Sequence, residues 1–441
     1  MILSGWGQYP KHDVSHHAPQ TVDELSEIVI SNSNIARGNG RAYGDSAINR
    51  TATVDMRNFN KLLSFDCQSG ELVSEAGVLL SDVIDVFLPR GWFPKVTPGT
   101  KFVTLGGMAA ADVHGKNHHK DGAFSGHVNW LEILSNNGKT ERCSRSSNPD
   151  LFNWSLGGMG LTGIITQLSL TLRPIQTSWI TQRKIIASNI DRAIDIFEDT
   201  ISDTTYSVAW IDCLARREKL GRSVITLGDH ANVNELPQAY RKSPLAYSKK
   251  RNLRIPFYLP SSLLNQMVIA TFNSLYFNLE KKKKSDSIVA LDRFFYPLDC
   301  ILEWNKMYGR RGFTQLQCVI PLDSSRVALR EILELTSTQN CGSFLAVLKR
   351  FGKQTSLISF PMEGYTLALD FPNSVHALNV VKTLHRIVCN YGGRFYLAKD
   401  SLLTEDELKN SDKRFLDYTK YRIANGMTET FNSEQSKRLG I

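Results

Sequence analysis

Three glycine-rich segments in the first third of the chain constrain its fold more than any other feature. They run through residues 36–46 (ARGNGRAYGDS), residues 97–119 and residues 157–163 (GGMGLTG). Glycine lets the backbone turn sharply and approach a ligand closely, and successive N–H groups in such turns can point at an anion. One such segment is typical of an ordinary loop. Three of them, with a basic His114-Gly115-Lys116 among them, favour a site for an anionic cofactor.

The third segment contains Gly158, Gly160 and Gly163 in the GxGxxG spacing of Rossmann dinucleotide-binding folds. In those folds the glycines leave a strand and open a helix, and an acidic residue follows about 20 positions later. Here a run of alternating apolar and polar residues, 164–170, follows the glycines, and none of the next ~20 residues is acidic. We therefore predict that the chain does not bind its cofactor through a Rossmann fold.

The length of 441 residues predicts two domains, because single cores stop growing near about 250–300 residues. Residues 1–175 alternate short strands and helices with glycine turns, which indicates an α+β nucleotide-binding domain; a helix over 21–31 and another over 81–88 are expected. Residues 176–400 hold longer, aromatic-rich strands and two amphipathic helices, over 324–338 and 374–391. Residues 401–441 predict a charged helical tail that packs back on the first domain.

Several motifs carry a resemblance that covers nearly the whole chain: GWG at 5–7, RGNGRAYGD at 37–45, TPGT at 97–100, HGKNHH at 114–119, the glycines at 157–163 and YLAKD at 396–400. On them the chain resembles flavoproteins of the vanillyl-alcohol-oxidase type, and within these the decaprenylphosphoryl-β-D-ribose 2-oxidase group. The resemblance implies an α+β fold: a two-part PCMH-type FAD-binding domain and a substrate domain with an antiparallel sheet covered by helices.

The same resemblance implies which residues hold FAD. These are Arg37, Gly38, Asn39, Gly40, Arg41, Ala42, Tyr43, Gly44, Asp45, Ser46, Gly99, Thr100, Thr104, Gly106, Gly107, Ala111, Asp112, His114, Ile164, Ile165 and Tyr396. Many relatives carry a histidine in the first segment that bonds covalently to the flavin. This chain has Tyr43 there, so we predict a non-covalent, dissociable FAD.

A flavin of this kind takes a hydride from a CH–OH carbon while a base takes the hydroxyl proton, and a nearby cation stabilises the charge that develops. The resemblance implies Lys399 as that cation and adds Tyr43 and His114 as catalytic candidates. Lys399 could instead be a solvated lysine, and His114 a structural hydrogen-bonding residue. The resemblance implies Lys349 and Gln317 on the substrate side, and strand alternation would place Gln315 on the same face as Gln317. Lys116, Lys399 and Trp210 complete the predicted substrate residues, although Trp210 could instead be a core residue.

Two features of these motifs limit the interpretation. His114 and His118 share i, i+4 spacing, but Gly115 and Asn117 disfavour a helix there and no carboxylate clusters with them, so no metal is expected. Relatives known for covalent inhibition have a cysteine shortly before Asp-Phe-Pro, whereas this chain has Ala368. The substrate identity therefore stays open.

The chain carries a net charge of +9, which indicates an anionic partner. Residues 241–284 combine Lys and Arg clusters with apolar runs. These residues could form a solvated loop and one buried helix. We favour a segment that faces an anionic membrane and receives a polyprenyl-phosphate-linked sugar. A nucleic-acid-binding role is disfavoured because the basic residues interleave with aliphatic runs and no recognition motif occurs.

Seven scattered cysteines without a CxxC pair, and an N-terminus without a secretory signal pattern, predict a cytoplasmic, peripherally membrane-associated protein. By the resemblance, the expected reaction is oxidation of the C2 hydroxyl of a polyprenyl-phosphoryl ribose to the 2-keto sugar, the first half of an epimerisation in cell-envelope polysaccharide synthesis. A short-chain NAD(P)H reductase would complete it. The alternative is a soluble sugar, alditol or aldonolactone oxidase that uses the same FAD.

Overall fold

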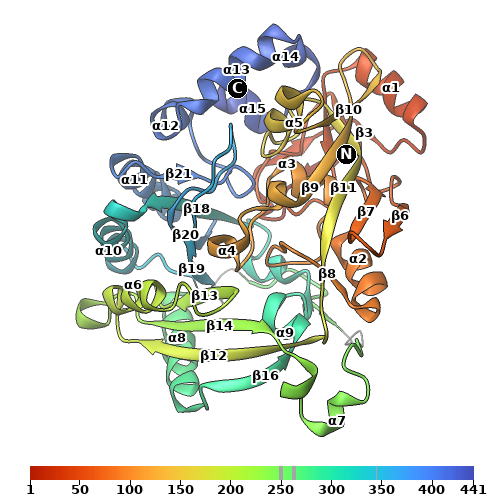
Figure 1. Ribbon diagram of the computed structural model, residues 1–441. Helices are drawn as coiled ribbons and strands as arrows, with labels where there is room; N and C mark the ends of the chain where they lie inside the picture. The colour runs from red at the N-terminus through yellow and green to blue at the C-terminus, as the bar shows by residue number, and fades with distance from the viewer. Residues whose placement is uncertain (248–251, 261–264, 344) are drawn as a thin grey trace.

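A computed structural model describes residues 1–247, 252–260, 265–343 and 345–441 (Figure 1). Lys249, Lys250 and Arg251 of the predicted basic segment lie outside the described residues. The chain forms an N-terminal part with three sheets, a central part built on one large sheet, and a helical C-terminal tail. Among the described residues, no helix is both long enough and apolar enough to cross a membrane.

The N-terminal part begins with a short antiparallel pair of strands, β1 (Ile2–Ser4) and β2 (Lys11–Asp13). Its first larger sheet is parallel, with the strand order β3 (His16–His17), β5 (Ala52–Asp55) and β4 (Asn34–Arg37). Helix α1 (Val22–Ser31) connects β3 to β4. The side chain of Thr21 accepts a hydrogen bond from the backbone N–H of Glu24, which caps this helix and confirms the helix predicted over 21–31.

A second, antiparallel sheet packs behind the glycine-rich segments. Its strand order is β10 (Thr140–Ser144), β9 (Val128–Leu134), β11 (Ile164–Pro174), β7 (Glu71–Glu75) and β6 (Leu62–Asp66), and β8 (Trp92–Pro94) also pairs with β11. The glycines at 157–163 lead directly into β11, so a strand and not a helix follows them. This confirms that the GxGxxG spacing is not a Rossmann fingerprint. The helices of this part are α2 (Leu80–Phe87), α3 (Leu105–Ala110), α4 (His118–Asp121) and α5 (Pro149–Ser155).

The central part is an eight-stranded sheet in which every pairing is antiparallel. Its order is β16 (Asp286–Ala290), β12 (Trp179–Ala187), β14 (Ser223–His230), β13 (Tyr206–Ile211), β19 (Ala346–Phe351), β20 (Gly364–Pro372), β18 (Phe313–Pro321) and β21 (Arg394–Phe395). Three helices, α6 (Ile190–Asp199), α10 (Leu322–Thr338) and α11 (Val375–Asn390), pack on one face of the sheet (Figure 1). The predicted sheet covered by helices is confirmed, as are the helices expected over 324–338 and 374–391.

Strand alternation gives this sheet two different faces. In β18, Leu316, Cys318 and Ile320 join the apolar core under α10 and α11, whereas Gln315 and Gln317 face a cavity. The opposite face of the sheet therefore looks towards the glycine-rich segments. Three further helices lie in the connections of this part: α7 (Gln238–Arg241), α8 (Gln266–Lys282) and α9 (Leu291–Phe295).

The tail forms α12 (Glu405–Ser411), α13 (Arg414–Ala424), α14 (Met427–Thr430) and α15 (Glu434–Leu439). It bonds to both other parts of the chain. The hydroxyl of Tyr418 donates to the carbonyl of Gly158 at 2.6 Å, and the amide of Gln435 donates to the carbonyl of Leu397 at 2.8 Å. The tail thereby holds the third glycine segment and the YLAKD motif in fixed positions.

Candidate active site

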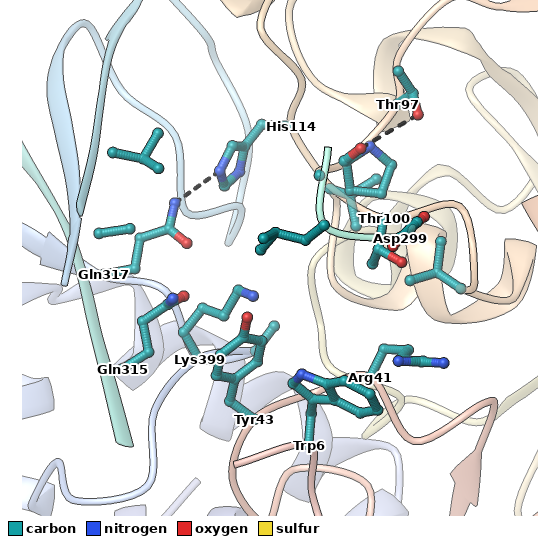
Figure 2. A pocket seen from close by; sticks show the side chains of 18 of the residues that line it. Trp6, Arg41, Tyr43, Thr97, Thr100, His114, Asp299, Gln315, Gln317 and Lys399 are labelled. Carbon is teal, nitrogen blue, oxygen red and sulfur yellow. Dashed lines mark hydrogen bonds between the residues drawn. The ribbon is translucent and has the colours of Figure 1, made fainter. Parts of the chain in front are cut away.

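A cavity of about 1100 Å³ lies between the glycine-rich segments and the open face of the large sheet. Figure 2 shows side chains from both parts pointing into it, among them Tyr43 and Arg41 from the first segment and Gln315 and Gln317 from β18. All three glycine segments contribute to its lining, although they are separated in the sequence. The fold thus brings the predicted cofactor segments and the predicted substrate residues to one site.

The first segment lines the cavity with residues 38–43 and Ser46. Gly40 has a φ of +63°, a left-handed conformation that glycine adopts without strain. Gly38 lies so close to Thr104 that an added Cβ would be 2.1 Å from its Oγ1. The guanidinium of Arg41 lies 4.0 Å from the ring centroid of Trp6, which also lines the cavity. Arg41 Nε is buried without a hydrogen-bond partner among the described residues.

Three predicted cofactor residues of the first segment do not line the cavity. Arg37 donates to the carbonyl of Ser4 at 2.8 Å, and the carboxylate of Asp45 accepts from Arg438 at 2.8 Å. Gly44 is buried against the backbone of Asp400. The contacts of these three residues hold the segment against the rest of the chain, and their predicted contact with FAD stays a prediction.

Asp112 and Ile164 also lie outside the cavity lining, and their predicted contact with FAD stays a prediction as well. Asp112 is fully buried, and its carboxylate accepts from the side chains of Ser125 at 2.9 Å and of Ser359 and from the Ser125 N–H. It ties α3 to neighbouring loops and is absent from the cavity lining. Of the two predicted isoleucines, only Ile165 lines the cavity, whereas Ile164 belongs to the apolar core behind it.

The remaining predicted residues of the second segment, together with Tyr396, lie on the cavity wall. They are Gly99, Thr100, Thr104, Gly106, Gly107, Ala111, His114 and Lys116. Thr104 caps α3 by accepting from the backbone N–H of Gly107 at 3.3 Å. The hydroxyl of Tyr396 donates to the carbonyl of Ala111 at 3.1 Å. This bond joins the YLAKD motif to the glycine-rich wall.

Lys399 lies at the polar end of the cavity, with its Nζ 3.4 Å from the ring centroid of Tyr43 (Figure 2). Burial lowers the pKa of Lys399 to about 7. The negative charge of Asp370 opposes this effect, and the positive charge of Lys349 reinforces it. Burial raises the pKa of Asp370 to about 7. Asp370 accepts a hydrogen bond from the Gln315 amide. Lys399 is therefore a buried group that titrates near neutrality, not a solvated lysine.

His114 is fixed from the sheet side. The amide nitrogen of Gln317 lies 2.9 Å from Nε2 of His114. Burial holds the pKa of His114 well below its usual range, and the positive charge of Lys349 adds to this effect. His114 is therefore neutral, accepts from Gln317 at Nε2 and carries its proton on Nδ1. Nδ1 is buried without a partner among the described residues. This arrangement favours a positioning and donor role over that of general base, because Nε2 is already occupied.

Two more buried lysines line the same cavity. Burial lowers the pKa of Lys116 to about 7 and that of Lys349 to about 8. The Nζ of Lys116 donates to the carbonyl of Phe294 and lies 4.5 Å from the centroid of its ring. Uncompensated basic groups in a buried cavity are costly unless an anion accompanies them. The lining is therefore suited to a negatively charged ligand.

Beyond Val347 the floor of the cavity becomes apolar. Val208 and Trp210 of β13 and Val224 of β14 line it, and Phe272 and Tyr276 of α8 cover it. The rings of Trp210 and Tyr276 meet edge to face at 4.7 Å. Past them the lining turns basic again. The residues of this end are Gln182, Lys184, Lys283 and Arg293, with one acidic residue, Glu280, paired to Lys184 and Lys283. The cavity thus has a polar end, an apolar middle and a basic far end.

Several lining residues were not predicted from the sequence. Trp6 lies in the GWG motif, which pointed to it without assigning a role. Asp299 accepts from the backbone N–H of Lys101 at 2.8 Å, and burial raises its pKa. Asp370 lies two residues after Ala368, near the position where relatives known for covalent inhibition have a cysteine. No sequence pattern identified the cavity residues of α8, because periodicity does not show which face of a helix covers a site.

The residues of the glycine-rich wall fit a bound dinucleotide cofactor. Glycines that allow close approach, the unpartnered Arg41 Nε and His114 Nδ1, and the buried lysines all match a ligand that carries phosphates and a flat ring system. Among the described ranges, no group of three or more His, Cys, Asp or Glu side chains is placed to hold a metal ion.

Comparison with known proteins agrees with this geometry. Residues 17–144 match a family model described as an FAD binding domain. Over 411 residues, 92% of this chain and 89% of the relative, the chain is 34% identical to decaprenylphosphoryl-beta-D-ribose oxidase of Mycolicibacterium smegmatis. It is 29% identical over 376 residues, 82% of this chain, to an uncharacterized protein of Streptomyces coelicolor. It is 25% identical to L-gulonolactone oxidase of Mus musculus over 189 residues, 40% of this chain and 42% of the relative.

Proposed function

Because this chain belongs to the family of FAD-binding oxidoreductases that includes decaprenylphosphoryl-β-D-ribose oxidase, we propose that it oxidises the C2 hydroxyl of a polyprenyl-phosphoryl pentose to a 2-keto sugar. The chain is an FAD-dependent oxidoreductase, and its relatives are named oxidases or dehydrogenases. The proposal concerns the substrate, the reaction at C2 and its place in an epimerisation of a cell-envelope precursor.

The change of lining along the cavity carries this proposal. Gln315, Gln317, Lys349 and Lys399 offer donors and positive charge at one end, which suits a sugar and its phosphate. The apolar floor under α8 suits the first units of a hydrocarbon chain. A free polyol or lactone would leave this apolar length unfilled.

The reaction needs the C2–H bond to break as a hydride and the hydroxyl proton to pass to a base as the carbonyl forms. When bound, FAD accepts the hydride. The side chains of this chain would bind and orient the sugar: Gln315 and Gln317 by their amides, and Lys349 by its charge. Lys399 supplies a positive charge in a site removed from water, where it stabilises developing negative charge more strongly than in solution.

The alternative substrate class, a soluble aldonolactone or polyol, is supported by the identity to L-gulonolactone oxidase. That identity covers only 40% of this chain. The relative that matches 92% of the chain acts, by its name, on a lipid-linked ribose. Coverage therefore favours the lipid-linked sugar.

Anaerobic titration of the purified holoenzyme tests the proposal. We expect stoichiometric bleaching of the flavin absorbance by a short-chain polyprenyl-phosphoryl ribose and no bleaching by ribose, xylitol or gulonolactone. Rapid bleaching by a free polyol or lactone, with none by the lipid-linked sugar, would show that the soluble compounds are the substrates and would contradict the proposal. We also propose that a short-chain NAD(P)H reductase consumes the 2-keto product, which a coupled assay with both proteins would detect as the epimerised sugar.

The absence of a histidine at position 43 predicts that FAD is released by denaturation. Tyr43 lies on the cavity wall but its phenol, whose pKa burial raises well above its usual range, stays neutral and protonated. Precipitation in acid should therefore leave yellow flavin in the supernatant and a colourless pellet. Colour retained by the pellet after washing would show a covalent link and contradict this prediction.

The pKa of Lys399 predicts opposite shifts for two neighbouring substitutions. If the charged form of Lys399 is the active one, flavin reduction falls as pH rises through about 7. The negative charge of Asp370 raises the pKa of Lys399 and the positive charge of Lys349 lowers it. In the plot of flavin-reduction rate against pH, Asp370→Asn should therefore move the fall at alkaline pH to lower pH. Lys349→Met should move this fall to higher pH. Stopped-flow reduction across pH would measure both, and shifts in the same direction would contradict the assignment.

A further inference from the structure

We propose that the outward face of α8 docks on an anionic lipid bilayer and that the cavity opens beside it, so that a lipid-borne substrate enters from the membrane. The lipid substrate rests on the proposed function, but docking of the helix does not. The inference goes beyond a basic segment in the sequence because it assigns the contact to one helix face and links that face to the cavity.

Helix α8 carries an exposed apolar stripe. Val268, Phe272, Leu275 and Leu279 follow one another at spacings of four, three and four residues, which places them on one side of a helix. Leu275 and Leu279 are each 58% exposed. The residues that α8 buries against the protein are Ile269, Asn273, Phe277 and Glu280. The apolar run is therefore not a wholly buried helix, and half of its large side chains face outward.

The C-terminal end of the stripe is strongly basic. Lys281, Lys282, Lys283 and Lys284 follow Leu279 and Glu280 and are exposed. Glu280 is engaged by Lys184 at 2.6 Å and by Lys283. An apolar stripe next to a lysine run matches the interface of an anionic bilayer, where leucines enter the acyl boundary and ammonium groups meet lipid phosphates.

Two members of the stripe also belong to the cavity wall. Val268 and Phe272, which are 47% and 46% exposed, also line the cavity, as does Tyr276. A second exposed apolar segment borders the same wall: Leu253, 74% exposed, lies in β15 (Leu253–Arg254), which pairs with β17 (Ile301–Leu302), and Ile301 lines the cavity. The exposed apolar surface therefore meets the cavity lining at two places, along α8 and through the pairing of β15 with β17.

Charge favours a bilayer over a second copy of the chain as the occupant of this face. The protein carries a net charge of +9, and a second copy would bring the same lysine run to the interface. An anionic surface instead neutralises these charges over the whole contact. A bilayer also explains why the apolar middle of the cavity begins beside the stripe, because a hydrocarbon chain could then pass between them without crossing water.

Cosedimentation of the holoenzyme with vesicles tests the docking step. Vesicles of phosphatidylglycerol and phosphatidylcholine, at low salt, should carry the protein into the pellet, and pure phosphatidylcholine should carry much less. The double variant Leu275→Ser/Leu279→Ser removes two stripe residues that do not line the cavity. We expect it to partition ~10-fold more weakly or worse, because leucine burial drives insertion.

A matched control replaces apolar residues of equal exposure elsewhere. Val327 of α10 is 59% exposed and Ile423 of α13 is 61% exposed. Val327→Ser/Ile423→Ser should bind vesicles like the unmodified protein. Equal binding by both double variants, or no binding of the unmodified protein to anionic vesicles, would overturn the proposal. So would light scattering that shows a dimer which only the Leu275→Ser/Leu279→Ser variant dissociates, because a second copy would then be the occupant.

The entry step is tested with one substrate in two forms. The Leu275→Ser/Leu279→Ser variant should oxidise a water-soluble short-chain lipid phosphate sugar at the normal rate and a long-chain one in vesicles ~10-fold more slowly. Equal rates with the vesicle-borne substrate would overturn entry from the membrane. If no lipid-linked sugar is oxidised by any variant while vesicle binding persists, the proposed function fails and the docking surface stands.

Discussion

Replacing Lys399 with methionine is expected to slow anaerobic flavin reduction ~100- to 1,000-fold, the usual cost of losing a preorganised charge in a buried active site. Lys399 Nζ lies over the Tyr43 ring at the polar end of the cavity, where little water screens its charge. Methionine keeps an unbranched side chain that is one atom shorter than lysine, and it removes the charge together with the N–H donors. Stopped-flow measurement of flavin bleaching by the preferred substrate gives the rate.

The fold should tolerate this change. Lys399 lowers the pKa of Asp370, so without Lys399 that pKa rises further and Asp370 becomes neutral rather than an unpaired buried anion. Lys353→Met, which removes an exposed lysine outside the cavity, is the control and should leave the rate unchanged. If Lys399→Met bleaches within a few-fold of the unmodified enzyme while retaining flavin, the charge of Lys399 is not part of the chemistry.

The glycine segments made much of this site predictable, because each one reflects a local backbone requirement. Glycine is needed at positions 38 and 40, where the chain meets Thr104 closely or turns. A short stretch of sequence is enough to reveal such a requirement. The alternation of Gln315 and Gln317 with apolar neighbours likewise predicted that both face one side of the sheet, and both line the cavity.

The predicted cofactor residues that lie outside the cavity lining have a different explanation. Asp45 and Asp112 belong to the same motifs as the lining residues, but their carboxylates accept from Arg438 and Ser359. A motif shows that a residue type is required; it does not show whether a ligand or the chain itself requires it. Partners hundreds of residues away in sequence decide this. Asp370 could not be found for the same reason, because its effect on Lys399 arises only when β20 and the YLAKD motif meet in space.

Gly44→Ala is expected to destabilise the protein by ~3 kcal/mol, the upper end of the usual cost of overpacking a buried site. An added Cβ would lie 1.9 Å from the carbonyl oxygen of Asp400, and its other near atoms also belong to backbone, so no side chain can rotate away. The first glycine segment would have to separate from the segment that carries Lys399. We therefore expect the variant to lose bound flavin as well as stability.

Thermal unfolding followed by tryptophan fluorescence, and the ratio of flavin to protein after gel filtration, measure the two effects of Gly44→Ala. The control is Gly126→Ala, where a Cβ meets a single neighbour, Asp121 O at 4.0 Å, outside the cavity lining. Gly126 has no left-handed φ, so alanine there should be neutral or slightly stabilising. Normal flavin content and an unchanged unfolding temperature in Gly44→Ala would mean that the contact between the first glycine segment and the YLAKD motif is looser than the structure places it, and that Lys399 is positioned by Tyr396 and the tail instead.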